Sequence, residues 1–136
     1  MIKVKISKDS KFVAKIVLYD DKKRVLMLKR SENHNKYPGE YDLPGGHVHI
    51  GEPILTGLAR EVEEETGIRI KKAKFYKKQE NKYFFYAKYK KQKINLSKEH
   101  TEFAFISKNK LNKSKKFENI AIKIIDKVNK NESKSK

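Results

Sequence analysis

The stretch GGHVHIGEPILTGLAREVEEETGI, residues 45–68, decides how this chain folds. From Ile54 onward its apolar residues recur at helical spacing, and Gly67 stands where a helix C-cap belongs. The pattern therefore predicts a helix over residues 54–66. At about 100° per residue, one face of this helix collects the side chains that we expect to pack in a core. These are Leu55, Leu58, Ala59, Val62 and Thr66.

A second face of the same helix carries the carboxylates of Glu61, Glu64 and Glu65, which lie within about 100° of one another. Like charges at this spacing repel one another, and the C-terminal end of a helix disfavours anions. Three carboxylates kept at such unfavourable positions indicate that the helix binds a ligand. Because the chain has no Cys, these carboxylates suit a hard cation such as Mg²⁺ or Mn²⁺. The alternative explanation is a solvated charged face.

The spacing around the helix is specific. Gly46 is followed after five residues by Glu52, and after seven more by the segment Arg60-Glu-Val-Glu-Glu-Glu-Thr-Gly-Ile68. This arrangement resembles the Nudix hydrolase signature, G-x5-E-x7-R-E-U-x-E-E-x-G-U with U aliphatic, at every defined position. The lead-in Leu43-Pro-Gly-Gly46 is also typical of that family. The match covers 23 residues, which we call the box (residues 46–68).

The resemblance implies an α+β fold, an α/β/α sandwich in which a mixed β-sheet lies between the box helix and a C-terminal helix. It also implies a hydrolase that cleaves a phosphoanhydride (pyrophosphate) bond in a small nucleotide-type substrate, with Mg²⁺ or Mn²⁺ as cofactor. The leading substrates are nucleoside triphosphates, including oxidised ones, followed by dinucleoside polyphosphates. We expect the fold to occupy residues 1–130 as one domain and residues 131–136 to fray as a tail.

The same resemblance assigns roles to residues of this chain. The metal ligands are expected to be the Gly45 carbonyl and the carboxylates of Glu61, Glu64 and Glu65. Glu52 is expected to pair with Arg60 and so fix the loop against the helix. Water is activated by a box glutamate or by a downstream one. Of the downstream candidates Glu99 and Glu102, we favour Glu102, because it directly precedes an expected strand.

Two residues outside the box are expected to bind the substrate. Arg30 ends a predicted hairpin strand, where related enzymes often place a cation on the substrate phosphates. Tyr86 lies 18 positions past Ile68, in the region where a Tyr of diadenosine polyphosphate hydrolases stacks on the base. The alternatives are surface charge for Arg30 and strand packing for Tyr86.

Outside the box, alternation of apolar and charged residues predicts a strand over residues 2–6, and runs rich in strand-forming residues predict strands over 12–19, 25–29, 68–76, 83–89 and 102–106. Residues 31–46 have little periodicity and are expected to form a loop. A C-terminal helix is predicted from a stripe at helical spacing that comprises Phe117, Ile120, Ala121, Ile124, Ile125 and Val128.

The charge is strongly asymmetric. The formal net charge is +17, of which residues 69–136 carry +16. Of the 34 basic residues 30 are Lys, which lacks the bidentate fork of Arg, so a solvated basic surface is favoured over a nucleic-acid site. The alternative function is an RNA-binding protein or an RNA 5′-end pyrophosphohydrolase. In that case Tyr83, Tyr86 and Tyr89 are expected to share one strand face and stack bases.

Composition excludes other classes. No apolar run approaches the roughly 18–20 residues of a membrane helix, and residues 1–6 alternate with charge, unlike a secretory signal. The absence of Cys excludes disulfides and thiolate metal sites. We therefore expect a cytoplasmic protein with no membrane partner, while its oligomeric state stays open.

Overall fold

The computed structural model describes residues 12–33 and 38–134 of the chain. The strand predicted over residues 2–6 lies outside these ranges. The elements are β1 (Val13–Tyr19), β2 (Val25–Arg30), β3 (Tyr41–Asp42), β4 (Gly45–His47), α1 (Ile54–Thr66), β5 (Lys74–Gln79), β6 (Lys82–Lys88), β7 (His100–Ile106), the 3₁₀ turn η1 (Lys108–Lys110) and α2 (Lys116–Lys134).

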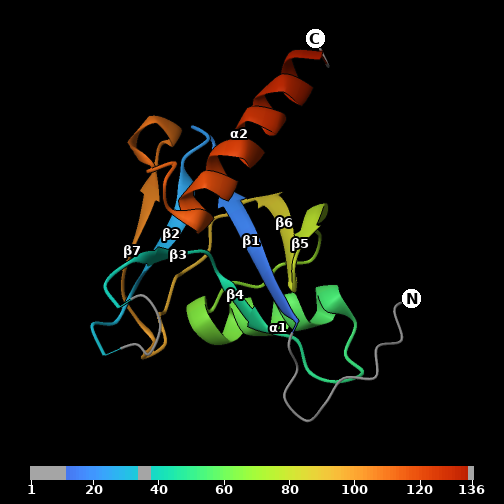
Figure 1. The fold of residues 1–136 in the computed structure, drawn as a ribbon, viewed down its shortest axis with the longest axis vertical. Coiled ribbons are helices and arrows are strands. Elements are labelled where there is room, and N and C mark those ends of the chain that lie inside the picture. Colours follow the sequence, from blue (N-terminus) through green and yellow to red (C-terminus); the bar gives the residue numbers. More distant parts are fainter. Residues whose placement is uncertain (1–11, 34–37, 135–136) are drawn as a thin grey trace.

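The strands form one mixed sheet in the order β3-β2-β1-β6-β5, with β4 added to β1 and β7 added to β2 (Figure 1). β1 and β6 run parallel over their whole length, from Val13 beside Lys82 to Tyr19 beside Lys88. The other neighbours pair antiparallel. The mixed sheet implied by the family resemblance is therefore confirmed.

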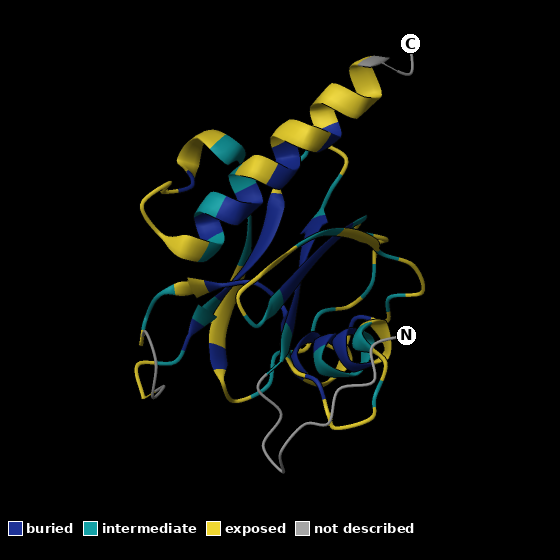
Figure 2. Cartoon of the chain, turned by 45° about the vertical axis from the view of Figure 1, so that its right-hand side comes forward, coloured by how far each residue is buried: buried dark blue, intermediate teal, exposed yellow. Residues whose placement is uncertain are grey.

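The two helices cover opposite faces of this sheet (Figures 1 and 2). On one face Leu58 and Val62 of α1 pack with Ala14, Ile16 and Leu18 of β1. On the other face α2 packs against a cluster that includes Val17, Met27 and Phe84. The predicted stripe of α2 is buried from Ile120 to Val128, with Phe117 partly buried beside it. This arrangement is the expected α/β/α sandwich.

Helix α1 has the predicted limits, and Gly67 caps it with a left-handed φ of 77° and an N–H that donates to Glu63 O. Its core face differs at two points, because Ala59 is only partly buried and belongs to neither core cluster, and Leu55 is exposed. Leu55, which the wheel placed in the core stripe, is 40% exposed. The prediction for Leu55 was wrong because this residue lies in the first turn of α1, beside an open pocket rather than over the sheet.

Two loop and strand boundaries also differ from expectation. The predicted loop over residues 31–46 contains β3 and β4, whose short segments pair with β2 and β1 through their backbones. The strand expected from residue 68 begins only at Lys74. Before it, the Arg69 backbone binds the Gln92 side chain, which accepts from Arg69 N–H at 2.8 Å and donates to Arg69 C=O at 3.1 Å. The Gln92 side chain thus satisfies the backbone groups of Arg69 that a neighbouring strand would otherwise bind.

The tyrosines of β6 do not share a face, so that expectation was wrong. Tyr83 packs in the cluster on the α1 side of the sheet and Tyr86 in the cluster on the α2 side, because alternate residues of a strand point to opposite faces. Both are buried, so they do not form a stacking platform. At the C-terminus, α2 runs to Lys134, so residues 131–134 of the predicted tail are helical.

Candidate active site

The candidate site lies at β4, whose Gly45–Gly46 segment, called the glycine strand below, packs between β1 and α1. Gly45 has a φ of 132°, and a Cβ atom there would lie 2.0 Å from Ala14 O. A Cβ on Gly46 would lie 2.1 Å from Glu61 Oε1. Gly45 therefore requires glycine, because its φ is left-handed and the clash is with backbone. At Gly46 the absence of a side chain lets the carboxylate of Glu61 lie directly against the backbone of this strand.

Arg60 ties the box together. Its Nε and Nη2 donate to the two oxygens of Glu52 at 2.9 and 3.1 Å, a bidentate pair that holds the preceding loop. Its Nη2 also donates to His47 O at 2.9 Å. On the other side, Nη1 donates to Glu61 at 2.9 Å and to Glu64 at 3.2 Å. The Arg60 hydrogen bond lowers the pKa of Glu52. One guanidinium thus connects the loop to two carboxylates of α1.

We expect Arg60→Lys to lower activity by about tenfold or more, although the charge is kept, because Lys cannot make the planar, bidentate contact with Glu52. Initial hydrolysis rates of the two proteins measure the effect. Arg24→Lys is the matched control, since Arg24 pairs with Asp20 in the exposed β1–β2 turn. Equal activity of Arg60→Lys and the parent would mean that only the charge matters at this position.

Glu65 differs from the other two carboxylates because it is buried. It is 5% exposed, and its Oε1 accepts the Gly45 N–H at 2.9 Å. Burial raises the pKa of Glu65 to about 8, although the positive charge of Lys15 opposes the rise. On the helical wheel Glu65 stands between the acidic face and the core stripe, and the structure places it on the core side.

The donor atoms at this strand fit a hard divalent cation. The Gly45 carbonyl and the carboxylates of Glu61 and Glu65 meet at the Gly45–Gly46 strand, and all are oxygens, as Mg²⁺ and Mn²⁺ prefer. In the ranges that the structure describes, no three acidic or His side chains converge on one point. The hydrogen bonds explain this, because Arg60 holds Glu61 and Glu64 while Glu65 accepts the Gly45 N–H.

A buried ion cluster that the sequence analysis missed lies next to this strand. The carboxylate of Asp42 accepts from Lys15 Nζ at 3.1 and 3.2 Å, and it lies 3.2 Å from Arg30 Nη2 and 3.3 Å from His100 Nε2. All four side chains are buried. Burial alone would raise the pKa of Asp42, but Lys15, the His100 hydrogen bond and Arg30 together hold it well below its usual range.

Lys15 links this cluster to the box. Its Nζ also reaches the carbonyl oxygens of Leu43 at 3.1 Å and Gly45 at 3.3 Å, so a buried ammonium lies beside the expected metal ligand. The sequence held one signal for it, since Lys15 is the only charged residue within the apolar strand VAKIVLY. Periodicity could not identify its partners, which are Asp42 of β3, Leu43 just after it and Gly45 of β4.

Three residues predicted to act outside the box lie apart from it. Arg30 is buried, with Asp42 as its ion partner. Glu102 lies within β7 and not directly before a strand, so the reason for favouring it was wrong. Its side chain is 70% exposed and 3.9 Å from Lys29 Nζ, and no ion pair in the described part of the chain joins it to α1. Tyr86 is buried on the α2 side of the sheet. The roles of these three residues therefore stay predictions.

The α/β/α sandwich, with its acidic helix α1 hydrogen-bonded to the glycine strand, defines a class of protein. Comparison with known proteins identifies the family. The profile of the NUDIX domain family matches residues 10–128. The chain therefore belongs to the NUDIX domain family.

Among solved structures, the chain resembles the MutT protein from Methanosarcina mazei Go1, with a TM-score of 0.71 and 28% identity over 92% of this chain and 99% of that one. Among curated proteins, it is 46% identical over 48 residues to the m7GpppN-mRNA hydrolase NUDT17 of Xenopus laevis, covering 35% of this chain and 16% of that protein. It is 45% identical over 58 residues to a MutT-like protein of Streptomyces ambofaciens, covering 43% of this chain and 34% of that protein. The matches thus span 16% and 34% of the lengths of these two curated relatives.

Neither helix of the described ranges is both long enough and apolar enough to cross a membrane.

Proposed function

We propose that this chain is a divalent-metal-dependent hydrolase that cleaves a phosphoanhydride bond in a small nucleotide, with nucleoside triphosphates as leading substrates and dinucleoside polyphosphates next. The observation that carries the proposal is the convergence of Glu61, Glu65 and the Gly45 carbonyl on one glycine strand. A solvated acidic face does not need an obligatory glycine at Gly45 or a buried carboxylate at Glu65. Action in the cytoplasm, expected from the sequence, is part of the same proposal.

The Gly45 carbonyl, Glu61, Glu64 and Glu65 would hold the cation. When bound, Mg²⁺ or Mn²⁺ supplies the positive charge that phosphate oxygens need next to a carboxylate cluster, and it activates water. The residues of the chain position these groups: Arg60 orients Glu61 and Glu64, and Glu52 anchors Arg60 to the loop. Positioning and charge neutralisation supply most of the acceleration in phosphoryl transfer. Glu102 or a box glutamate accepts the proton of the attacking water.

A panel assay tests this proposal. The full chain is incubated with nucleoside triphosphates, 8-oxo derivatives and dinucleoside polyphosphates, with Mg²⁺, with Mn²⁺ or with EDTA, and released phosphate and pyrophosphate are quantified. We expect release that depends on the metal and disappears in Glu61→Gln. Release that persists in EDTA, or no release from any member of the panel, would contradict the proposal.

A second candidate is an RNA 5′-end pyrophosphohydrolase, favoured by the charge of +16 on residues 69–136 and by the similarity to a relative named as an mRNA cap hydrolase. Burial of Tyr83 and Tyr86 on opposite faces of β6 speaks against base stacking by this strand. We therefore expect no submicromolar RNA affinity at 0.15 M salt.

Binding of a 5′-triphosphorylated oligonucleotide to the Glu65→Gln protein, measured across salt concentrations, checks this expectation. Weak binding lost by 0.15 M salt agrees with a solvated basic surface. Submicromolar affinity whose logarithm falls by about 0.7 per contacted phosphate with log salt would overturn our choice of substrate class.

A further inference from the structure

The two polar backbone groups of Gly45 point away from β1. Gly45 stands opposite Lys15 where β4 pairs with β1, and the neighbouring Pro44 carbonyl accepts the Ile16 N–H at 3.0 Å. Hydrogen-bonded and non-hydrogen-bonded pairs alternate along antiparallel strands, so Lys15 and Gly45 form a non-hydrogen-bonded pair. The N–H and the carbonyl of Gly45 therefore take their partners from elsewhere.

Two buried ionisable side chains supply these partners. The Gly45 N–H donates to Glu65 Oε1 of α1 at 2.9 Å. The Gly45 carbonyl accepts from Lys15 Nζ at 3.3 Å, and the same ammonium donates to Leu43 O at 3.1 Å. A glycine has no side chain of its own to hold its backbone in place, so these contacts fix the direction of the Gly45 carbonyl.

The ammonium of Lys15 is itself held in one position. Asp42 accepts from Nζ with both carboxylate oxygens, at 3.1 and 3.2 Å. An ammonium has three N–H donors, and the Asp42 carboxylate with the carbonyls of Leu43 and Gly45 provides an acceptor for each. On the α2 side the ring of Phe117 covers the group, with its centroid 5.4 Å from Nζ.

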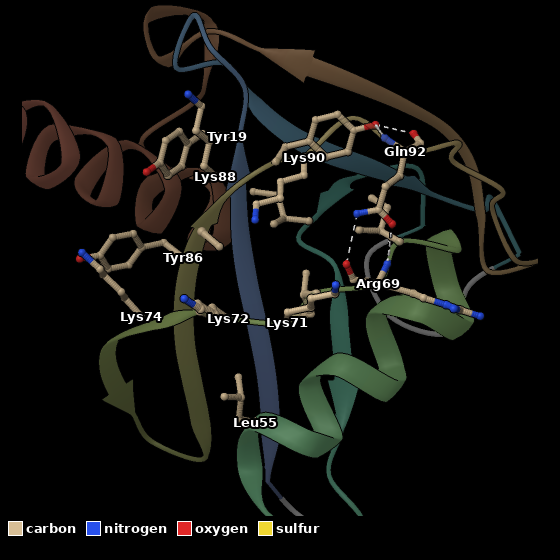
Figure 3. A pocket seen from close by; sticks show the side chains of 16 residues that line it. Tyr19, Leu55, Arg69, Lys71, Lys72, Lys74, Tyr86, Lys88, Lys90 and Gln92 are labelled. Carbon is tan, nitrogen blue, oxygen red and sulfur yellow. Dashed lines mark hydrogen bonds between the residues drawn. The ribbon is translucent and has the colours of Figure 1, made fainter.

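Packing alone does not explain a lysine at this position. Among residues 12–33 and 38–134, Lys15 is the only buried lysine. Figure 3 shows the usual placement, in which Lys71, Lys72 and Lys74 line an open pocket at the surface. Removing an ammonium from water costs free energy, and apolar residues often stabilise a fold as well as a buried ion pair does. Val17, on the same face of β1, is such an apolar residue.

We propose that Lys15 is a positioning residue for the metal site: its ammonium, anchored by Asp42, fixes the direction of the Gly45 carbonyl that the cation would use as a ligand. This inference rests on the proposed function, because it concerns the same metal ligands. The alternative is an ion pair that joins β1 to β3 and acts on a cation only through its charge.

The two explanations predict opposite changes. A positive charge repels a nearby cation, so removal of a lysine that acted only through its charge would strengthen metal binding. Removal of a positioning lysine weakens metal binding, because the carbonyl loses its fixed direction. Partners that orient metal ligands typically contribute about 10–100-fold to metal affinity.

The first test measures Mn²⁺ binding to the full chain without nucleotide, from the electron paramagnetic resonance signal of free Mn²⁺. We expect Lys15→Met to bind Mn²⁺ at least about tenfold more weakly than the parent. Asp42 keeps Arg30 as an ion partner in this variant. The control is Lys108→Met, which removes a lysine paired with Asp126 at the surface and should change the affinity less than about twofold.

A chemical restoration separates the ammonium from the packing of the side chain. The chain has no Cys, so Lys15→Cys carries a single thiol. Alkylation of the unfolded variant with 2-bromoethylamine, followed by refolding, creates a side chain with the length and ammonium of lysine. Alkylation with 1-bromopropane creates the same shape with a methyl group instead. We expect the aminoethyl protein to bind Mn²⁺ within about threefold of the parent and the propyl protein at least about tenfold more weakly. Circular dichroism and thermal melts confirm that both are folded.

A measurement on the parent needs no variant and applies even if the variants do not fold. The parent is labelled with ¹³C at glycine carbonyls and ¹⁵N at lysine Nζ, and Mg²⁺ is added to the metal-free protein. We expect the Gly45 carbonyl and Lys15 Nζ signals to shift together, with one midpoint, because the two atoms share a hydrogen bond. A Lys15 Nζ signal that stays unchanged while Gly45 shifts would overturn the proposal.

Equal or tighter Mn²⁺ binding by Lys15→Met, or equal affinities of the aminoethyl and propyl proteins, would also overturn it. Failure of the proposed function is distinguishable from these results. A parent that binds Mn²⁺ but hydrolyses no nucleotide contradicts the function, while a tenfold loss of affinity in Lys15→Met still supports the positioning role. A parent that hydrolyses nucleotides while Lys15→Met binds Mn²⁺ normally contradicts the positioning role alone.

Discussion

Glu65→Gln is expected to lower hydrolytic activity by at least about 10²-fold while leaving the thermal midpoint nearly unchanged. Gln keeps the size of Glu65 and an oxygen that accepts the Gly45 N–H, so the contact between α1 and the glycine strand survives. What is lost is the carboxylate that Glu65 would present once a cation displaces its proton, and loss of a metal partner typically reduces activity by this order. Initial rates at saturating Mg²⁺, with a thermal melt of each protein, measure both parts of the prediction.

Glu63→Gln is the matched control. Glu63 lies on the same helix but pairs with Arg69 at the exposed surface, so we expect its replacement to change activity less than about twofold. If Glu65→Gln keeps activity within a few-fold of the parent while melting normally, Glu65 is not a ligand, and its burial serves only the packing of α1 on the glycine strand.

The second large effect is on stability. Asp42→Asn should lower the free energy of unfolding by about 3–5 kcal/mol, because it removes the anion shared by Lys15 and Arg30 and leaves two buried cations without it. The Asn side chain has nearly the same volume, so the loss reports the charge and not a cavity. Urea denaturation of both proteins at pH 7 measures the difference.

The pH dependence of this loss has a definite sign. The pKa of Asp42 is lower in the folded protein than in the unfolded chain, where it is about 3.9, so its charge stabilises the fold fully above that value. As the pH falls below about 4 toward the native pKa, the contribution is lost. The stabilities of the parent and Asp42→Asn should therefore converge in acid.

Asp126→Asn is the control for this experiment, since Asp126 pairs with Lys108 at the exposed surface of α2. Exposed pairs are worth about 0–1 kcal/mol, so we expect a small effect with little dependence on pH. Equal losses from Asp42→Asn and Asp126→Asn at pH 7 would show that the buried cluster does not contribute more to stability than a surface pair.

Local sequence determined the parts of this protein that obey a period or a spacing. The limits of α1 follow from its apolar repeat and from Gly67, and the buried stripe of α2 follows from its own repeat, because a helix fixes which residues share a face. The spacing of the box residues identified the family. Leu55 is exposed although its helical position predicted burial, because the helical repeat gives the direction of a side chain but not where the sheet beneath the helix ends.

The tertiary structure decided what depends on partners distant in the sequence. Strands β3 and β4 have few apolar side chains and exist because β1 and β2 supply backbone partners for them. The cluster of Lys15, Arg30, Asp42 and His100 joins four strands, and the burial of Glu65 depends on how closely the glycine strand approaches α1. The pocket beside Leu55 is formed in part by residues 68–73 and 89–92, which lie about twenty residues apart in the sequence. Sequence alone determined the faces of the helices and the identity of the box, because both follow from local geometry. Long-range packing determined which charges are buried and where the surface is hollow, because burial depends on the elements that fold against a residue and not on its neighbours in the chain.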